Sequence, residues 1–198
     1  LSNNMDIHYY FPTPIAIEKN NELANQMLPV ARKYLNDTTL LTNTWGYKNT
    51  YNPDSGIADC EDIAPFINFI HAKGKEFLFK NGYDADNINF STQVFVSEMF
   101  EGDSHGLHTH PNSILSGLLY LEVPEGSAPI IFSDPRPFRS IITLPKKGDV
   151  ITNWEQTFFQ PEDGTFMIWE SWLGHEVPKN HSKSGRVTMV FNLGRVPK

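Results

Sequence analysis

Three of the histidines in this sequence lie within six positions, in the stretch 101–121 (EGDSHGLHTHPNSILSGLLYL). Imidazole is the commonest protein ligand for iron, zinc and copper. His108 and His110 are two residues apart, so in an extended segment both side chains project to the same side and can reach one point. The apolar run 114–121 that follows is typical of a strand. We therefore predict a metal site at the mouth of a β-barrel, with a further ligand supplied from elsewhere in the chain.

Composition limits the class of protein. The chain has 198 residues, of which 39% are hydrophobic and 13% aromatic, which suits one compact domain over residues 1–198. Cys60 is the only cysteine, so no internal disulfide can form and secretion gains no support. The formal net charge of −7 disfavours broad nucleic-acid binding, although a local basic patch stays compatible with it. The sequence shows no signal peptide and no apolar run long enough to span a bilayer, so we expect a cytoplasmic protein.

The order of the expected elements predicts the fold. Residues 1–87 are expected to hold an edge strand over 6–17, interrupted by Pro12 and Pro14, and two helices. The first helix is expected over 22–35, where Pro29 would either kink the helix or move its start. The second has its apolar positions over 63–77, with Asp59 or Asp62 as its cap and Asn81-Gly82 at its end.

Residues 88–198 read as short strands separated by turn signals. The strands are expected at 90–100, 114–123, 130–132, 141–144, 150–153, 165–170 and 186–192. Two helices followed by such strands predict a mainly β protein with flanking helices, a double-stranded β-helix or jelly roll. The long polar and aromatic segment 36–56 is a candidate to cover the functional site.

The far end of the chain supplies the candidates that would complete the site. His175 follows an apolar strand and a turn, and a jelly roll can bring two distant strand ends together at one barrel mouth. Arg186 comes eleven positions later and begins the last strand, where Arg186 and Thr188 face the same way. If that way is inward, the buried guanidinium needs an anion, and a carboxylate fits it in bidentate fashion, with Thr188 as a further donor. The alternative is that Arg186 faces solvent.

These motifs together resemble the Fe(II)- and 2-oxoglutarate-dependent oxygenases. The pattern of that family is His-x-Asp/Glu at one strand end, a distant His, and Arg-x-Ser/Thr about ten residues beyond it. Here it reads His108-Thr109-His110, His175 and Arg186-Val187-Thr188. The strings HTHPNSILSGLLYL, FSDPR and WLGHEVPKN look like one branch of the superfamily found in marine bacteria and their phages. The resemblance covers residue 90 to the C terminus well, and the helical N-terminal part only loosely.

The resemblance implies cofactors and roles. Fe(II) would be held by His108, His175 and His110, and 2-oxoglutarate would pair with Arg186, assisted by Thr188. With molecular oxygen as the other co-substrate, the products would be succinate, CO2 and a hydroxylated substrate. Further residues of the neighbouring strands that could line the pocket, with plain packing as the alternative for each, are Ser116, Tyr120 and Gln93.

One departure from the family pattern concerns the third ligand. His110 stands where the family has a carboxylate, and three neutral imidazoles would leave the iron centre more positive. The carboxylate could instead come from elsewhere, with Asp103 as the nearest candidate, and Asn112 or water could also fill the position. His105, in a loop next to glycine, is expected to have a supporting or surface role rather than to bind the metal.

Two other classes of protein remain as alternatives. A cupin dioxygenase would share the fold, because Gly102, five residues and then His108-x-His110 match the start of the first cupin motif. That motif next requires a glutamate where this chain has Ile114 and Leu115. A non-enzymatic jelly-roll binding module would use the aromatic residues of 45–51 as its contact surface. The prime substrate cannot be read from the sequence. We expect a homodimer because jelly-roll enzymes often form dimers.

Overall fold

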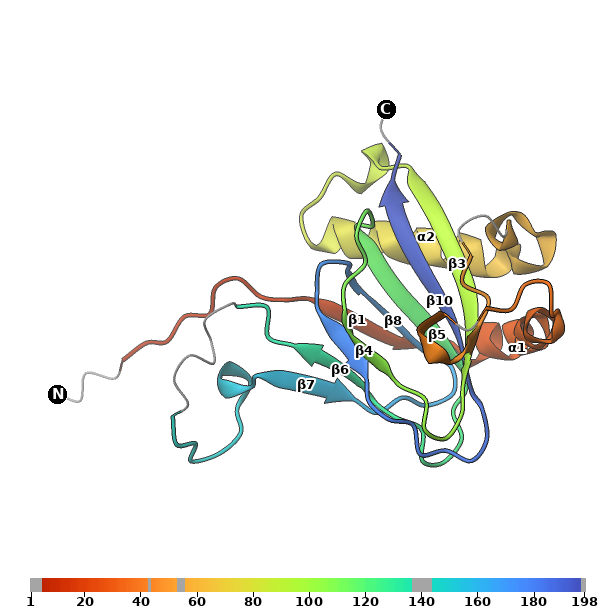
Figure 1. Ribbon diagram of the computed structural model, residues 1–198. Coiled ribbons are helices and arrows are strands. Elements are labelled where there is room, and N and C mark those ends of the chain that lie inside the picture. Colours follow the sequence, from red (N-terminus) through yellow and green to blue (C-terminus); the bar gives the residue numbers. More distant parts are fainter. Residues whose placement is uncertain (1–4, 43, 53–55, 137–143, 197–198) are drawn as a thin grey trace.

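The computed structural model describes residues 5–42, 44–52, 56–136 and 144–196 and forms two facing antiparallel sheets (Figure 1). The larger sheet has the strand order β1-β8-β5-β10-β3-β2 and the smaller one β4-β9-β6-β7. The larger sheet consists of β1 (Ile15–Lys19), β2 (Lys48–Asn49), β3 (Phe90–Met99), β5 (Leu115–Glu122), β8 (Thr165–Glu170) and β10 (Arg186–Arg195). The smaller sheet consists of β4 (His105–His108), β6 (Ile130–Ser133), β7 (Gln156–Phe159) and β9 (His175–Val177). This arrangement is the predicted jelly roll.

Successive side chains of β10 point to opposite faces of the larger sheet, and each face packs against a different part of the core. Figure 1 shows α2 (Ala64–Lys80) running behind β5, β10 and β3, and α1 (Asn21–Asn36) lies on the same face of the larger sheet. Val187, Met189, Phe191 and Leu193 are fully buried against these helices. Each such side chain contributes roughly 1.5–3 kcal/mol by its burial. The intervening residues of β10 therefore face the smaller sheet, and Arg186 is the first of them.

The two helices differ from the prediction in their details. Helix α1 starts at Asn21, where the Asn20 side chain accepts a hydrogen bond from the Leu23 amide, and it continues past Pro29, so that proline does not delay its start. Helix α2 ends at Lys80, immediately before the predicted stop. Its expected aspartate cap is wrong, because Ile63 occupies the N-cap position with no side-chain cap. Asp62, in the 3-10 turn just before α2, instead accepts hydrogen bonds from Tyr34 and Lys33 of α1, and so links α1 to the start of α2.

The strand predictions are mostly confirmed in the C-terminal half. The strands at 90–100, 114–123, 130–132, 165–170 and 186–192 are all present. Residues 150–153 are not a strand, since the structure has the 3-10 helix η5 (Ile151–Asn153) there. The prediction at 141–144 falls largely outside the described residues. The opening strand is confined to Ile15–Lys19, after both prolines, because proline lacks the donor that a sheet ladder needs. Four short strands within the described residues were not predicted from the sequence, namely β2, β4, β7 and β9.

The N-terminal part contributes short elements that connect the helices to the sheets. The 3-10 helices are η1 (Thr44–Gly46), η2 (Ile57–Asp59), η3 (Glu61–Ile63) and η4 (Ala85–Asn87). Strand β2 pairs with β3, so the segment 44–51 is fixed to the edge of the larger sheet. None of the described helices has the length and apolar character needed to cross a bilayer.

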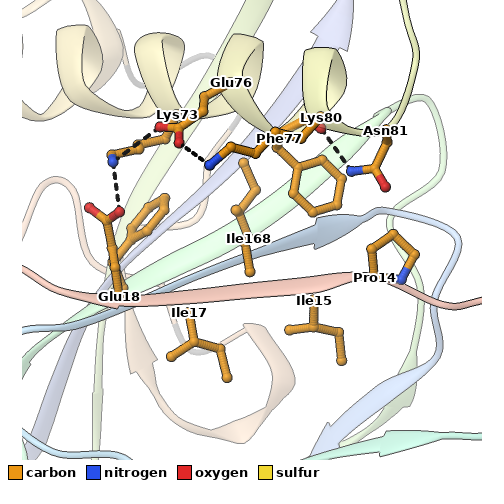
Figure 2. A pocket seen from close by; sticks show the side chains of 12 residues that line it. Pro14, Ile15, Ile17, Glu18, Lys73, Glu76, Phe77, Lys80, Asn81 and Ile168 are labelled. Carbon is orange, nitrogen blue, oxygen red and sulfur yellow. Dashed lines mark hydrogen bonds and ion pairs between the residues drawn. The ribbon is translucent and has the colours of Figure 1, made fainter.

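A hollow of about 270 Å³ lies between the edge strand β1 and helix α2 (Figure 2). Its charged side chains pair with one another, since the Lys73 ammonium lies 2.6 Å from Glu18 and 3.2 Å from Glu76. Glu76 also pairs with Lys80, at 2.5 Å. The predicted histidines and Arg186 do not line this hollow, so it is separate from the candidate site.

Candidate metal centre

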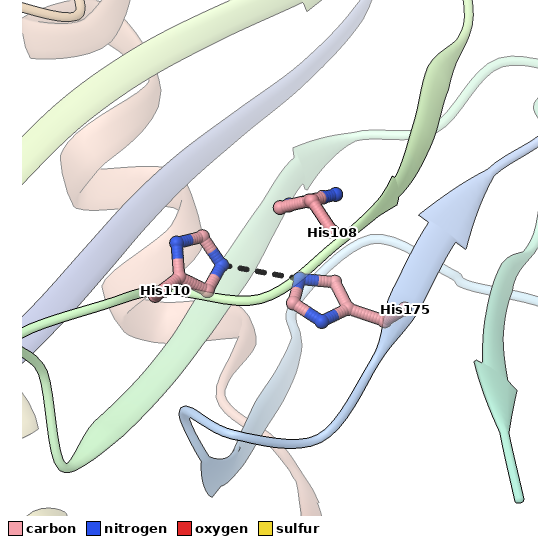
Figure 3. Close-up of side chains that lie close together, drawn as sticks. All are labelled: His108, His110 and His175. Carbon is pink, nitrogen blue, oxygen red and sulfur yellow. Dashed lines mark hydrogen bonds between the residues drawn. The ribbon is translucent and has the colours of Figure 1, made fainter. Parts of the chain in front are cut away.

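The structure brings the side chains of His108, His110 and His175 close together (Figure 3). One ring nitrogen from each lies within 4.8 Å of the others, and the Nε2 atoms of His110 and His175 are 3.1 Å apart. Antiparallel pairing of β4 with β9 causes this meeting, because His108 lies directly opposite His175 in the register. His110 follows two residues after the end of β4. Three imidazoles that converge in this way are a natural ligand set for a borderline transition metal.

Backbone groups hold the three rings in a metal-binding orientation. His108 Nδ1 lies 2.8 Å from the Gly106 carbonyl oxygen, and His175 Nδ1 lies 2.9 Å from that of Leu173. An Nδ1–H that donates to a carbonyl leaves the Nε2 lone pair free for a metal, which is the usual support of a histidine ligand. The His110 amide donates to the Ser171 carbonyl at 3.0 Å, which fixes the turn that carries its ring.

The rings stay neutral because they are partly or fully buried next to one another. Burial and the neighbouring imidazoles lower the pKa of His110 to about 3. The same causes, opposed by the hydrogen bond to Leu173, lower the pKa of His175 to about 4. Burial also lowers the pKa of His108. Because only neutral imidazole binds a metal, the site is ready for one at neutral pH.

These shifts predict how the stability of the metal-free protein depends on pH. In the unfolded chain the histidines return to the ordinary pKa of 6.5, so between pH 6.5 and about 4 the unfolded state binds more protons than the folded state. We expect the free energy of unfolding to fall as pH decreases through this window and to lose this dependence above it. Urea unfolding at a series of pH values measures the free energy of unfolding as a function of pH. The His110→Ala variant should flatten the curve, whereas the same substitution at the exposed His181 should not; equal curves for wild type and His110→Ala would contradict the prediction.

The ligand group that the described residues form contains no carboxylate. Asp103, the alternative third ligand, accepts a hydrogen bond from the Phe100 amide at 2.8 Å and closes the turn after β3. Asn112 has the left-handed backbone angle φ 66° in the turn after His110, where its role is conformational. The geometry therefore favours His110 over both.

Arg186 is only 3% exposed, so its side chain faces inward and the solvent-facing alternative is wrong. One terminal nitrogen donates to the Ala128 carbonyl at 2.9 Å, and the other lies 2.8 Å from the Met99 sulfur. The guanidinium carbon is 5.6 Å from the centre of the Tyr120 ring. Burial lowers the pKa of Arg186 from its ordinary value, but a guanidinium remains charged in proteins.

Among the described residues, Arg186 has no carboxylate as an ion-pair partner. Within the described part of the chain its Nε and the Tyr120 hydroxyl have no hydrogen-bond partner although both are buried. A buried cation without a counter-ion and a buried hydroxyl without a hydrogen-bond partner are costly, so such a pair is expected to serve a bound anion. These two unsatisfied groups are the strongest indication in the structure of a carboxylate-binding pocket.

The other pocket candidates are already hydrogen-bonded within the protein. Thr188 shares a hydrogen bond of 2.6 Å with Ser97. The Ser116 hydroxyl shares a hydrogen bond of 2.7 Å with the Ser171 hydroxyl and donates to the Asn192 side chain at 2.8 Å. The side-chain amide of Asn192 in turn donates to Gln93 at 3.0 Å. Because Ser171 also holds the His110 amide, Ser116 contributes to the frame of the centre through a chain of hydrogen bonds.

Aromatic rings surround the histidines, and some of them were not predicted. Trp169 is buried and meets His175 edge-on at 4.8 Å, whereas Trp172 is half exposed. His105 lies flat against His108, with 3.9 Å between ring centres, which agrees with a supporting role. Tyr47, which was not predicted individually, lies 3.1 Å from His105. The only sequence signal for Tyr47 was the long aromatic segment 36–56.

Comparison with known proteins supports the fold described above. None of the curated protein sequences compared with the chain matches it. Among solved structures, a prolyl-4-hydroxylase from Pseudomonas putida is similar over 93% of this chain and 94% of its own, with 13% identity and a TM-score of 0.62. A prolyl 4-hydroxylase from Phytophthora capsici is similar over 92% of this chain and 59% of its own, with 13% identity and a TM-score of 0.62.

A third similar structure is the Trichoplax adhaerens prolyl hydroxylase in complex with a hypoxia-inducible-factor peptide. It covers 91% of this chain and 83% of its own, with 12% identity and a TM-score of 0.58. At this identity the three structures support the shared fold alone. The sequence model of the 2OG-Fe(II) oxygenases matches residues 93–192, just over half of the chain, and spans every predicted ligand and Arg186. The chain therefore belongs to the 2OG-Fe(II) oxygenase family, whose members use Fe(II), 2-oxoglutarate and molecular oxygen.

Proposed function

We propose that His108, His110 and His175 hold the iron of this oxygenase, and that Arg186 binds the far carboxylate of 2-oxoglutarate. The observation that carries this assignment is the buried guanidinium without an anion on the sheet face that looks toward three converging imidazoles. When bound, the iron with 2-oxoglutarate and oxygen supplies the oxidising chemistry, with succinate and CO2 as co-products. Hydroxylation of a prime substrate is the reaction we infer.

The residues of this chain have separable tasks in the proposed reaction. Arg186 orients the co-substrate by a charge-assisted, bidentate contact. The Tyr120 hydroxyl, buried beside that guanidinium, supplies a hydrogen bond to the same carboxylate. Thr188 holds Ser97 rather than standing free, so its contribution is to fix the wall of the pocket. The apolar core between the sheets, with Trp169 and Phe132, excludes water beside His175.

The assay that tests the function measures 2-oxoglutarate turnover. We expect succinate formation that requires both Fe(II) and 2-oxoglutarate and stops with a chelator. A cupin dioxygenase would show turnover without 2-oxoglutarate, and a binding module would show none. The net charge of −7 supports a small molecule or a peptide over nucleic acid as the prime substrate.

The histidine at position 110 has an electrostatic consequence that can be tested. Three neutral imidazoles leave the metal its full double charge, which attracts the doubly negative co-substrate. A carboxylate there would cancel one charge, and at an effective dielectric constant of about 20 two unit charges 5 Å apart interact by about 3 kcal/mol. We expect His110→Asp to keep Fe(II) but to bind 2-oxoglutarate about 100-fold more weakly, since 1.4 kcal/mol is tenfold, measured by anaerobic titration. His181→Asp, the same change at an exposed position, is the matched control; equal or tighter 2-oxoglutarate binding by His110→Asp would count against His110 as a ligand.

A further inference from the structure

We propose that Tyr47 and His105 are positioning residues of the iron centre, through which the segment 44–51 sets the orientation of His108. The inference rests on the proposed function, because it takes His108 as a metal ligand. It adds a role for the N-terminal segment, which lies outside residues 93–192 and so outside the part of the chain that the family model covers.

Three flat rings form a stack that ends on His108. The His105 and His108 rings are 3.9 Å apart at 14°, close to parallel. The Trp45 indole stacks on His105 at 4.8 Å and 29°. No ring contact among the described residues joins Trp45 directly to His108, so the His105 ring lies between them. The His108 ring therefore cannot tilt toward His105 without displacing both rings behind it.

Tyr47 fixes the middle ring of the stack. Its hydroxyl shares a hydrogen bond of 3.1 Å with His105 Nδ1, which selects the tautomer and the rotation of that imidazole. Tyr47 is only 5% exposed and packs in a cluster with Met99 and Ala128. Both Met99 and Ala128 also contact the Arg186 guanidinium. Tyr47 thus spans the histidine side and the arginine side of the site.

The backbone of the segment 44–51 has an unfavourable conformation at Trp45, the outermost ring of the stack. Trp45 has φ 67° and ψ 7°, a left-handed conformation that is a genuine outlier for a bulky side chain. Such conformations cost about 1–3 kcal/mol and persist where the surroundings enforce them. Here the Asn49 side chain donates to the carbonyls of Thr44 and Tyr47, at 2.9 and 2.8 Å, while the Tyr51 ring packs on the indole at 4.5 Å.

The strain is consistent with positioning rather than with simple packing. Trp45 remains 42% exposed, so the strained backbone does not serve to bury the indole. What the conformation achieves is the stack on His105, and through it the support of His108.

The test measures metal binding and its spectroscopic signature, independently of turnover. Anaerobic Fe(II) titration and the ligand-field absorption of the Co(II) protein are recorded for wild type, Tyr47→Phe, His105→Phe and His105→Ala. Loss of a group that supports a metal ligand typically weakens metal binding 10- to 100-fold, and we expect that for His105→Ala, with a shifted Co(II) spectrum. His105→Phe, which keeps a flat ring, should recover most of the affinity. Tyr47→Phe should weaken it about threefold, a smaller loss because Tyr47 acts one layer further out.

Controls separate this proposal from the metal site itself. Tyr83→Phe removes the same hydroxyl from an exposed tyrosine and should leave the affinity and the spectrum unchanged. If His175→Ala loses Fe(II) but His105→Ala binds it as wild type does, the positioning role is overturned and the metal site stands. If His175→Ala also binds as wild type does, the proposed function fails instead. Should His105→Ala not fold, Tyr47→Phe decides, and an Fe(II) affinity and a Co(II) spectrum equal to those of wild type in that variant overturn the proposal.

Discussion

Replacing His175 with alanine is expected to weaken Fe(II) binding by more than about 100-fold, beyond the loss seen when only a supporting residue of a metal ligand is removed. His175 is 4% exposed, and its ring is fixed on two sides, by the Leu173 carbonyl and by the Trp169 ring. The variant leaves His108 and His110, two neutral imidazoles from one short segment, which cannot complete the site. Anaerobic Fe(II) titration measures the loss.

The control for this prediction is His71→Ala. His71 is another partly buried histidine, hydrogen-bonded to Thr92 at 2.6 Å and outside the ligand group, so its loss should not change Fe(II) affinity. Thermal unfolding of both metal-free variants checks that each is folded. Fe(II) affinity within a few-fold of wild type in a folded His175→Ala protein would remove His175 from the centre.

Replacing Arg186 with methionine is expected to have two opposite effects. The affinity for 2-oxoglutarate should fall by about 30-fold to several thousand-fold, since truncating one partner of a buried charge pair costs about 2–5 kcal/mol and 1.4 kcal/mol is tenfold. The protein without 2-oxoglutarate should be as stable as wild type or more stable, because an unpaired buried cation is replaced by an apolar side chain of similar length. A purely structural arginine would predict the reverse for stability.

Two measurements separate these effects. Titration of the Fe(II) protein with 2-oxoglutarate gives the affinity, and urea unfolding without 2-oxoglutarate gives the stability. Arg186→Lys, which keeps the charge but loses the bidentate geometry, should fall between wild type and Arg186→Met in affinity. Fe(II) binding without co-substrate should be nearly unchanged in both variants. Undiminished 2-oxoglutarate affinity in Arg186→Met would remove that residue from the pocket.

Local sequence patterns were sufficient for pairs of residues two positions apart, whose side chains project to the same side of an extended segment. The spacing of two between His108 and His110 predicted their convergence, and the spacing of two between Arg186 and Thr188 predicted a shared face. That this face is the inner one follows from the next-door residues Val187 and Met189, which are fully buried against the helices. Sequence could not decide this, because a strand with buried residues on both faces shows no clean alternation of apolar and polar side chains.

Local sequence patterns could not predict which strands far apart in the sequence pair with each other. Strand β9 has three residues and pairs His175 with His108, 67 positions earlier, in a register that only the folded sheet fixes. The role of Asp62 was mistaken for a similar reason: a good capping residue was available locally, but the hydrogen bonds from Tyr34 and Lys33 of the other helix compete for the same carboxylate. Tyr47 belongs to a segment without periodicity, so nothing in the sequence could place it beside His105.

The most direct test of the account is a crystal structure of the protein with Fe(II) and 2-oxoglutarate, grown without oxygen, with anomalous scattering measured at the iron edge. We predict one iron peak bonded to a nitrogen of each of His108, His110 and His175, with the far carboxylate of 2-oxoglutarate against the Arg186 guanidinium and the Tyr120 hydroxyl. Iron bound through Asp103 or at another place, or a 2-oxoglutarate carboxylate that leaves Arg186 without an anion, would contradict it.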